Sequence, residues 1–275
     1  MKPCRSPKRR PWERRVEMLP LLLDRFAPKQ LVIQITDRCN ARCPQCGMRV
    51  STVFPRSTLN PDDIRRTIDA AAAQGVKVIS FTGGEPLLML DVLIPLIHHA
   101  GKAGIPYIRT GTNGFVFMDR DDARFETRVR RVVDRLAETP LRNFWISLDS
   151  ALPEVHEQMR GFPAVVAGIG KALPLFHDAG LYPSVNLGIN RNLSRGTMHL
   201  NPPPDAAGLE TYLEKFYREF RDAFGAFYRL VVDLGFTIVN SCYPMSIAPA
   251  DGDSPLRAVY GASSTDRVIS FTRAE

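Results

Sequence analysis

Residues 30–46 read QLVIQITDRCNARCPQC, which is a short apolar strand followed at once by three closely spaced cysteines. The spacing of Cys39, Cys43 and Cys46 places three thiols on one loop. Three thiolates can bind three irons of a cubane iron–sulfur cluster and leave the fourth iron open to another ligand. A structural zinc site usually closes with four ligands in paired spacings, and no second Cys or His pair lies nearby. The loop therefore predicts an iron–sulfur centre, with a closed zinc site or three unrelated thiols as the alternatives.

Strand-like and helix-like segments alternate downstream of this loop. The expected strands are 30–36, 77–82, 106–112, 143–149, 183–189 and 235–241. The expected helices cover about 60–74, 88–103, 121–138, 153–160, 164–179 and 206–234. Such alternation predicts an α/β fold with a parallel sheet and right-handed crossovers. The number and even spacing of the strands favour a partial (β/α)6 TIM-like barrel over a flat doubly wound sheet.

Chemically distinctive residues follow the expected strands. In parallel α/β folds, ligands bind at the carboxyl ends of the strands. Besides the cysteines, the residues at those ends are Gly83-Gly84-Glu85, Thr112-Asn113, Asp149, Asn190 and Cys242. Their coincidence at one edge of the sheet predicts a single functional site there.

Composition and charge narrow the class of protein. The 275 residues are 44% hydrophobic and 24% charged, which is typical of a globular chain. No window of 18 apolar residues exists, so we expect no membrane partner. Residues 1–30 hold nine of the 36 Lys and Arg residues and three of the 29 Asp and Glu residues, so +6 of the net +7 lies there. This basic tail can contact RNA or an acidic partner, but a solvated arm is the simpler interpretation.

The two ends of the chain complete the expected domain organisation. Residues 1–29 are expected to form a basic tail with a short helix, and its apolar run at 18–23 is too short for a signal peptide. We therefore expect a cytoplasmic protein with reduced thiols. Residues 30–275 are expected to form the core domain, with an irregular stretch at 243–269 that is a candidate lid. Thr272 and Glu275 have capping-box spacing, so we expect that the core stops short of a final helix and of any C-terminal extension.

Four motifs occur in order along the chain. They are Cys39-x3-Cys43-x2-Cys46, Gly83-Gly84-Glu85-Pro86, Thr112-Asn113-Gly114, and the Ser147 to Ser150 strand end followed by His156 and Arg160-Gly161. On these residues the sequence resembles the radical S-adenosylmethionine (SAM) superfamily over about residues 30–242. It is most similar in style to the SPASM and molybdenum-cofactor-cyclase branch, which includes peptide- and protein-modifying enzymes.

The resemblance implies a radical SAM enzyme with two cofactors. Cys39, Cys43 and Cys46 would bind a 4Fe–4S cluster, and the amine and carboxylate of SAM would chelate its open iron. The reduced cluster would cleave SAM to a 5′-deoxyadenosyl radical, which takes a hydrogen atom from the substrate. An electron donor such as flavodoxin or ferredoxin is implied. No nucleic-acid partner is expected for this reaction.

The resemblance also assigns the polar contacts of SAM. The segment from Gly83 to Glu85 would accept hydrogen bonds from the amine, and glycines permit a close approach of the backbone. Ser147 and Arg160 match positions that contact the methionine carboxylate or the ribose, and a planar guanidinium suits a carboxylate. The Thr112-Asn113 pair belongs to the same site. Taken alone, Arg160 would be a surface ion pair and Glu85 a favourable acid at a helix N-terminus.

Several positions depart from the family pattern or stay open. Relatives commonly carry an aromatic residue before the third cysteine, where Gln45 stands here and is expected to hydrogen-bond the adenine edge. Leu187 is expected to supply an apolar or backbone contact to adenine. Asp149 is either a catalytic group or a structural acceptor. Cys242 is either a small buried residue or a group that binds a second cluster, binds substrate or passes a hydrogen atom.

The substrate class cannot be chosen from one motif. The resemblance favours peptide or protein modification, with a small molecule of a cofactor pathway close behind and RNA modification third. A non-catalytic iron–sulfur module for binding or electron transfer is the alternative from another class. The intact SAM motifs at Gly83–Gly84–Glu85 and at Ser147 and Arg160 argue against that module.

Overall fold

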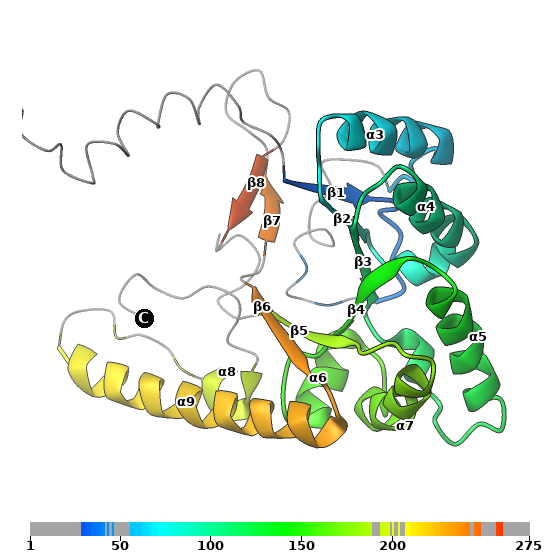
Figure 1. Cartoon of the computed structure of the whole chain (residues 1–275). Helices are drawn as coiled ribbons and strands as arrows, with labels where there is room; N and C mark the ends of the chain where they lie inside the picture. The colour runs from blue at the N-terminus through cyan, green and yellow to red at the C-terminus, as the bar shows by residue number, and fades with distance from the viewer. Residues whose placement is uncertain are drawn as a thin grey trace, which may run out of the picture.

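The computed structural model describes residues 29–41, 43, 46, 56–188, 193–198, 200, 203, 207–242, 245–248 and 257–260. Six parallel strands form one sheet in the order β1-β2-β3-β4-β5-β6, an arc that stays open between β1 and β6 (Figure 1). The strands are β1 (Gln30–Gln34), β2 (Val78–Thr82), β3 (Tyr107–Thr112), β4 (Leu141–Ser147), β5 (Ser184–Gly188) and β6 (Ile238–Cys242). The predicted partial barrel is confirmed, since spatial and sequence order of the strands coincide.

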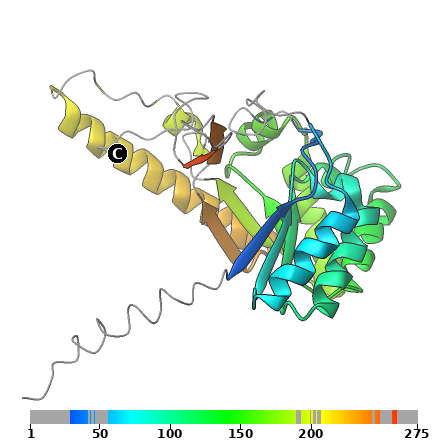
Figure 2. The same ribbon diagram turned by 90° about the horizontal axis from the view of Figure 1, so that it is seen from above.

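Helices cover the outer face of this arc. The crossover helices are α3 (Pro61–Ala73), α4 (Leu90–Lys102), α5 (Phe125–Ala137) and α7 (Val165–Asp178). The shorter ones are η1 (Pro86–Met89), η2 (Phe115–Phe117), α6 (Pro153–Arg160) and α8 (Arg195–Met198). The long helix α9 (Leu209–Leu234) runs beside β5 and β6 and extends beyond the sheet (Figures 1 and 2). No helix among the described residues is both long enough and apolar enough to span a membrane.

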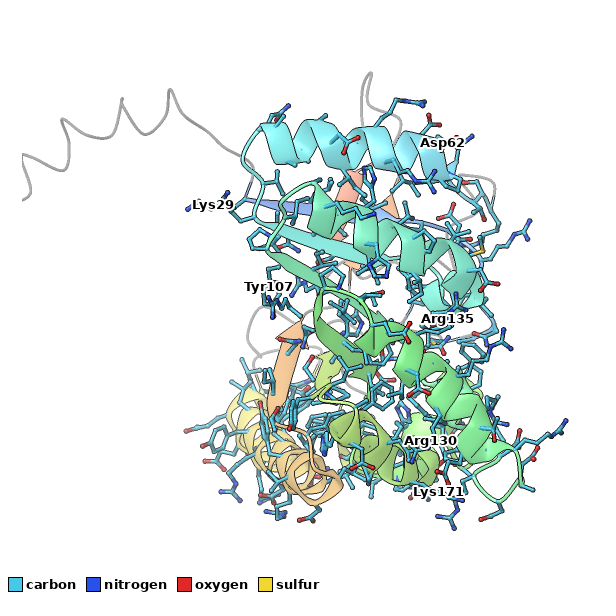
Figure 3. The ribbon with its side chains drawn as sticks, turned by 45° about the vertical axis from the view of Figure 1, so that its right-hand side comes forward. Lys29, Asp62, Tyr107, Arg130, Arg135 and Lys171 are labelled. Carbon is cyan, nitrogen blue, oxygen red and sulfur yellow. The ribbon has the colours of Figure 1, made fainter. Side chains whose placement is uncertain are left out.

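Local signals explain where the elements begin. Asn60 caps α3, and its side chain accepts a hydrogen bond from the Asp62 N–H at 2.8 Å, with Pro61 in the first helical position. In α9, Phe220, Phe227 and Val231 are buried and belong to the hydrophobic core. Charged side chains such as Asp62, Arg130 and Lys171 lie on the outer faces of the helices (Figure 3).

Side chains alternate along each strand between an outer face, which packs against the helices, and an inner face, which lines the barrel. Ile33, Ile79 and Ile108 point outward into the apolar core between sheet and helices. Burial of each such side chain stabilises the fold by about 1.5–3 kcal/mol. The inner face carries polar side chains among apolar ones: the Gln30 amide donates to the Ser80 hydroxyl at 3.1 Å. The interior of the barrel therefore offers hydrogen-bonding groups that the outer core lacks.

The structure differs from the prediction in the stretch after β6 and at the start of α4. The stretch at 243–269, expected to be irregular, contains the antiparallel strands β7 (Met245–Ala248) and β8 (Arg257–Tyr260). Each has only four residues, which is too short for a periodic signal. The helix expected from residue 88 begins at Leu90, after the 3₁₀ turn η1 that Pro86 opens. The expected tail helix and the capping box at 272–275 lie outside the described residues.

Candidate active site

The cysteine loop leaves β1 and packs against the loop that leaves β2. The Gly84 N–H donates to the Thr36 carbonyl at 2.7 Å, and the Glu85 N–H donates to the Arg38 carbonyl at 2.9 Å. In the cysteine loop, the Cys46 N–H donates to the Cys43 carbonyl at 3.1 Å. The predicted cysteine and glycine motifs are thus joined by main-chain hydrogen bonds.

The two glycines make this contact possible. A Cβ atom on Gly84 would lie 2.1 Å from the Arg38 carbonyl oxygen, and one on Gly83 would lie 2.5 Å from the Thr36 oxygen. No side chain fits at either distance. Close approach of the backbone to SAM was the reason expected for these glycines, and their packing on the cysteine loop is a second reason within the chain itself.

The Glu85 carboxylate accepts hydrogen bonds from two N–H groups of the protein itself. Its side chain is fully buried and caps η1: Oε1 accepts from the Leu87 N–H at 3.0 Å, and Oε2 accepts from the Asn113 N–H at 2.7 Å. Burial raises the pKa of Glu85 to about 7, although these hydrogen bonds oppose the shift. The simpler interpretation of Glu85 as a helix N-terminal acid therefore holds for its side chain. A contact of the Gly83–Glu85 backbone with the SAM amine stays a prediction.

Asn113 connects β3 to the cysteine loop. Its Nδ2 donates to Asn40 Oδ1 at 2.9 Å and lies 3.5 Å from the Cys39 sulfur. The preceding Thr112 hydroxyl accepts from the Gly114 N–H at 3.1 Å and so shapes the turn. The Thr-Asn-Gly motif is therefore part of the site, where it orients the first cysteine.

Arg160 and Asp149 form a buried ion pair. Arg160 donates through Nε and Nη2 to the two carboxylate oxygens, at 2.6 and 2.8 Å. The Asp149 N–H donates to His156 Nδ1 at 3.1 Å. Burial alone would raise the pKa of Asp149, but the charge of Arg160 and the contact with His156 outweigh it and hold this pKa well below its usual range. Asp149 is 1% exposed, so this is not the surface ion pair that Arg160 alone would suggest.

The charge of Arg160 also reaches the cysteines. Burial raises the pKa of the Cys43 thiol to about 11, and Arg160 is the group that opposes this shift most. Burial raises the pKa of Cys39 as well. Thiols must lose their protons to bind iron, so a nearby cation favours the ligating form.

A cavity of about 230 Å³ lies at the carboxyl ends of β2, β3 and β4. It brings together seven of the predicted SAM-binding residues: Gly83, Gly84, Glu85, Thr112, Asn113, Ser147 and Arg160. These residues come from four elements spread over 78 positions of the chain, which is why only the fold can place them around one space.

The same cavity is also lined by Gly111 and Trp145, which no sequence motif had marked. They face each other in the β3–β4 ladder, and a Cβ on Gly111 would lie 2.3 Å from the indole nitrogen of Trp145. A glycine inside a strand often marks such a close approach, and this was the signal available in the sequence.

The remaining predicted residues are not gathered at this cavity. The side chain of Leu187 lies in the apolar core at 0% exposure, because the alternation of β5 turns it toward the helices. With this side chain in the core, the backbone of Leu187 is the part left for the expected contact with adenine, which stays a prediction. Gln45, Asn190 and the side chain of Cys242 lie outside the described residues, although the backbone of Cys242 pairs with Gly188.

The donor set of the loop suits a cubane cluster. Among the described residues, no three His, Cys, Asp or Glu side chains are arranged to hold a single metal ion. In a cubane each thiolate binds a different iron, so three ligands need not converge on one point as they do around zinc. Cys39, Cys43 and Cys46 are free thiols on one loop and would hold three irons of such a cluster.

Comparisons with known sequences agree with this site. The model of the radical SAM superfamily matches residues 33–190. A GTP 3′,8-cyclase of Vibrio cholerae is 31% identical over 197 residues, covering 68% of this chain and 53% of the relative. A probable GTP 3′,8-cyclase of Thermococcus kodakarensis is 29% identical over 178 residues, covering 62% and 52%. The chain thus spans about half the length of these curated relatives.

Solved structures share the fold. Streptococcus suis SuiB bound to S-adenosylmethionine aligns with a TM-score of 0.54 at 15% identity, covering 90% of this chain and 48% of SuiB. The hydrogenase maturase HydG of Carboxydothermus hydrogenoformans aligns with a TM-score of 0.51 at 14% identity, covering 79% and 45%. The match to the family model and the geometry of the motifs carry the family assignment, and the solved structures agree with it in fold. This chain belongs to the radical SAM superfamily, whose cofactors are a 4Fe–4S cluster and S-adenosylmethionine.

Proposed function

We propose that this chain is the SAM-cleaving core of a radical SAM enzyme that takes a hydrogen atom from a small-molecule substrate. One observation carries the proposal: Glu85 and Asn113 line a single cavity and are hydrogen-bonded to each other, and the Asn113 side chain also contacts the Cys39 sulfur. A module that only carries electrons needs thiols for its cluster. It does not need a cavity built from three strand ends beside those thiols.

The roles of the residues follow from their contacts. Cys39, Cys43 and Cys46 would hold the cluster, and Asn113 orients the first of these ligands. The backbone of the Gly83–Glu85 segment lines the cavity and would receive the amine of SAM. A reduced 4Fe–4S cluster held by these three thiolates would supply the one-electron reduction of SAM from which the hydrogen-abstracting radical comes.

Arg160 would bind the carboxylate or ribose of SAM. Its Nε and Nη2 are engaged by Asp149, so Nη1 is the donor that no described residue engages. Because Asp149 already fixes the guanidinium through two hydrogen bonds, the Arg160 side chain loses little further freedom when a ligand binds. Asp149 is then a positioning residue rather than a reacting group.

The substrate class rests on the relatives. Those named GTP 3′,8-cyclase act on a nucleotide, and this supports the cofactor-pathway branch of the sequence prediction. The likeness to SuiB concerns the fold alone at 15% identity, so it does not support peptide modification. We further propose a cytoplasmic location and a flavodoxin- or ferredoxin-type electron donor. RNA modification rested on the basic tail, which lies outside the described residues.

The test is anaerobic reconstitution with iron and sulfide, followed by SAM and dithionite. We expect 5′-deoxyadenosine from the parent chain and from Cys4→Ala, a matched change in the tail, and none from Cys43→Ala. A parallel reaction with GTP asks whether the nucleotide is consumed. A reconstituted cluster with no 5′-deoxyadenosine in any sample would overturn the proposal.

A further inference from the structure

Arg109 is a cation inside the barrel that the cluster and SAM sites do not use. It lies on β3 between Ile108 and Thr110, which are 1% and 0% exposed on the outer, helix-covered face. Alternation therefore turns Arg109 to the inner face. Its Nε donates to the Ser80 hydroxyl at 2.6 Å, and that hydroxyl also accepts from the Gln30 amide.

Two neighbours fix the guanidinium. Ser80 holds it through Nε, and its central carbon lies 5.9 Å from the centre of the Trp145 ring. A cation at this distance from an indole is attracted to it. A long side chain held at both places has already lost much of its freedom, so a ligand would meet a preformed donor fork.

The charge of Arg109 has no ion-pair partner among the described residues. Across the described part of the chain, no carboxylate lies within ion-pair distance of Arg109, whereas Arg160 has Asp149 and Arg135 has Asp91. No described residue accepts a hydrogen bond from its Nη groups. The Arg109 side chain is partly exposed, so an anion that enters the barrel could reach its Nη donors.

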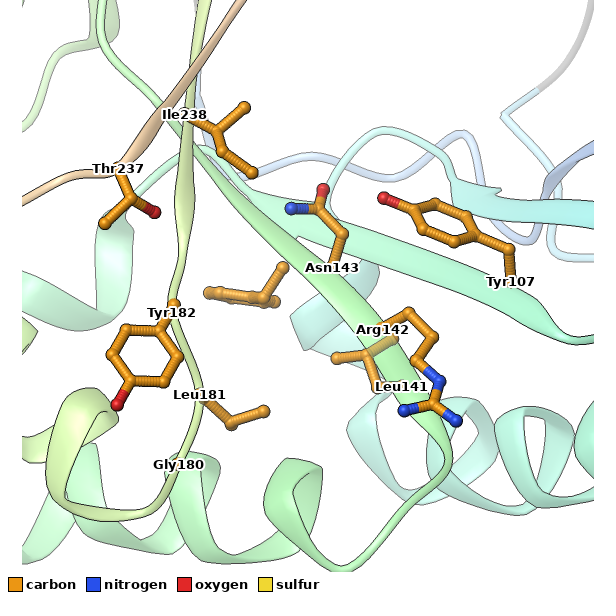
Figure 4. Close-up of a pocket in the computed structure, with 10 residues that line it drawn as sticks. Tyr107, Leu141, Arg142, Asn143, Gly180, Leu181, Tyr182, Thr237 and Ile238 are labelled. Atoms are coloured by element: carbon orange, nitrogen blue, oxygen red, sulfur yellow. The ribbon is translucent and has the colours of Figure 1, made fainter.

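Arg109 stands between two cavities. It faces Asn143 in the β3–β4 ladder, and Asn143 lines a second cavity of about 280 Å³ at the amino ends of the strands (Figure 4). Two residues further along each strand, Gly111 and Trp145 line the candidate SAM cavity. Arg109 therefore lies on the inner face, in the ladder between residues that line one cavity and residues that line the other.

We propose that Arg109 is the centre of an oxyanion-binding subsite, with Ser80 and Trp145 as its positioning residues. The subsite would take a carboxylate or phosphate group of the substrate, since a guanidinium fork matches the paired oxygens of either. This inference rests on the proposed function, because it places the rest of the substrate toward the SAM cavity.

The test uses Trp145 as a local reporter. The sequence has two tryptophans, Trp12 and Trp145, so in Trp12→Phe all tryptophan emission comes from Trp145. The reconstituted full chain in this background is titrated anaerobically with pyrophosphate in one arm and malonate in the other. The arms separate a phosphate-bearing substrate from a carboxylate-bearing one. Arg109→Gln removes the fork, Arg109→Lys keeps the charge, and Arg130→Gln is a matched change on the outer surface.

We expect at least one anion to change Trp145 emission saturably. Arg109→Gln should weaken the apparent Kd at least tenfold, Arg109→Lys should weaken it less, and Arg130→Gln should leave it unchanged. The subsite is overturned if neither anion elicits a response, or if Arg109→Gln binds as tightly as the parent. SAM cleavage by the parent chain, measured in the same preparation without anion, separates these results from a failure of the proposed function.

Discussion

Arg160 and Asp149 meet as a two-pronged ion pair at the rim of the candidate SAM cavity, with donor–acceptor distances of 2.6 and 2.8 Å. The aspartate follows β4 and the arginine ends α6, so the pair also joins a strand end to the helix beyond it. Because the Asp149 side chain is 1% exposed and that of Arg160 is 15% exposed, removal of the aspartate charge would leave a largely buried guanidinium without its counter-charge.

We therefore predict that Asp149→Asn lowers the free energy of unfolding by about 3–5 kcal/mol and weakens SAM binding. Denaturant unfolding and a SAM titration of the reconstituted chain measure the two effects. Asp91→Asn is the matched control, because it breaks the Arg135 pair at an aspartate that is 85% exposed. That change should cost less than about 1 kcal/mol. Equal losses in the two variants would contradict the importance of the buried pair.

Glu85 predicts a pH dependence of stability. Its pKa is raised to about 7 in the folded chain, chiefly by burial, whereas an exposed glutamate titrates near 4.5. The folded state thus holds a proton that the unfolded state has lost, so the contribution of Glu85 to stability is complete below pH 4.5 and is lost as pH rises through 7. A shift of this size corresponds to about 3 kcal/mol at most.

The measurement is the difference in unfolding free energy between the parent chain and Glu85→Gln across this pH range. We expect the parent to lose stability relative to Glu85→Gln between pH 4.5 and 8. Glu126→Gln, at an exposed glutamate paired with Arg130, should show no such slope. A flat difference for Glu85→Gln would mean that its two N–H donors, from Leu87 and Asn113, keep the folded carboxylate charged throughout.

Gly84→Ala tests the contact between the glycine and cysteine loops. The new methyl group would overlap the Arg38 carbonyl, so the loops must separate, with an expected stability loss of about 1–3 kcal/mol. We expect less iron bound after reconstitution, because Cys39 directly follows Arg38. Gly225→Ala is the control: this glycine lies in α9, where the nearest atom to a new Cβ is 3.5 Å away. Full iron content in Gly84→Ala would show that the loop contact is dispensable.

Much of the architecture is visible in local sequence patterns. The alternation of short apolar runs with helical segments predicts β1 to β6 in the right order, because periodicity and capping act within a few residues. Asn60 and Pro61 show this at α3. The antiparallel strands β7 and β8 were missed, since four-residue strands depend on a partner for their hydrogen bonds more than on their own pattern.

The candidate site, like the fold, combines features that the sequence shows with contacts that only the tertiary structure shows. The sequence by itself determined the cysteine loop, the glycine motif and their place at the carboxyl ends of parallel strands, because each is a short-range pattern tied to one strand end. Only the tertiary structure decided what each side chain contacts: Glu85 with Asn113, Arg160 with Asp149, Gly111 beneath Trp145, and Arg109 with Ser80 and Trp145. These contacts depend on strand register and on which face of a strand looks inward, and both are set by pairing between segments far apart in the chain.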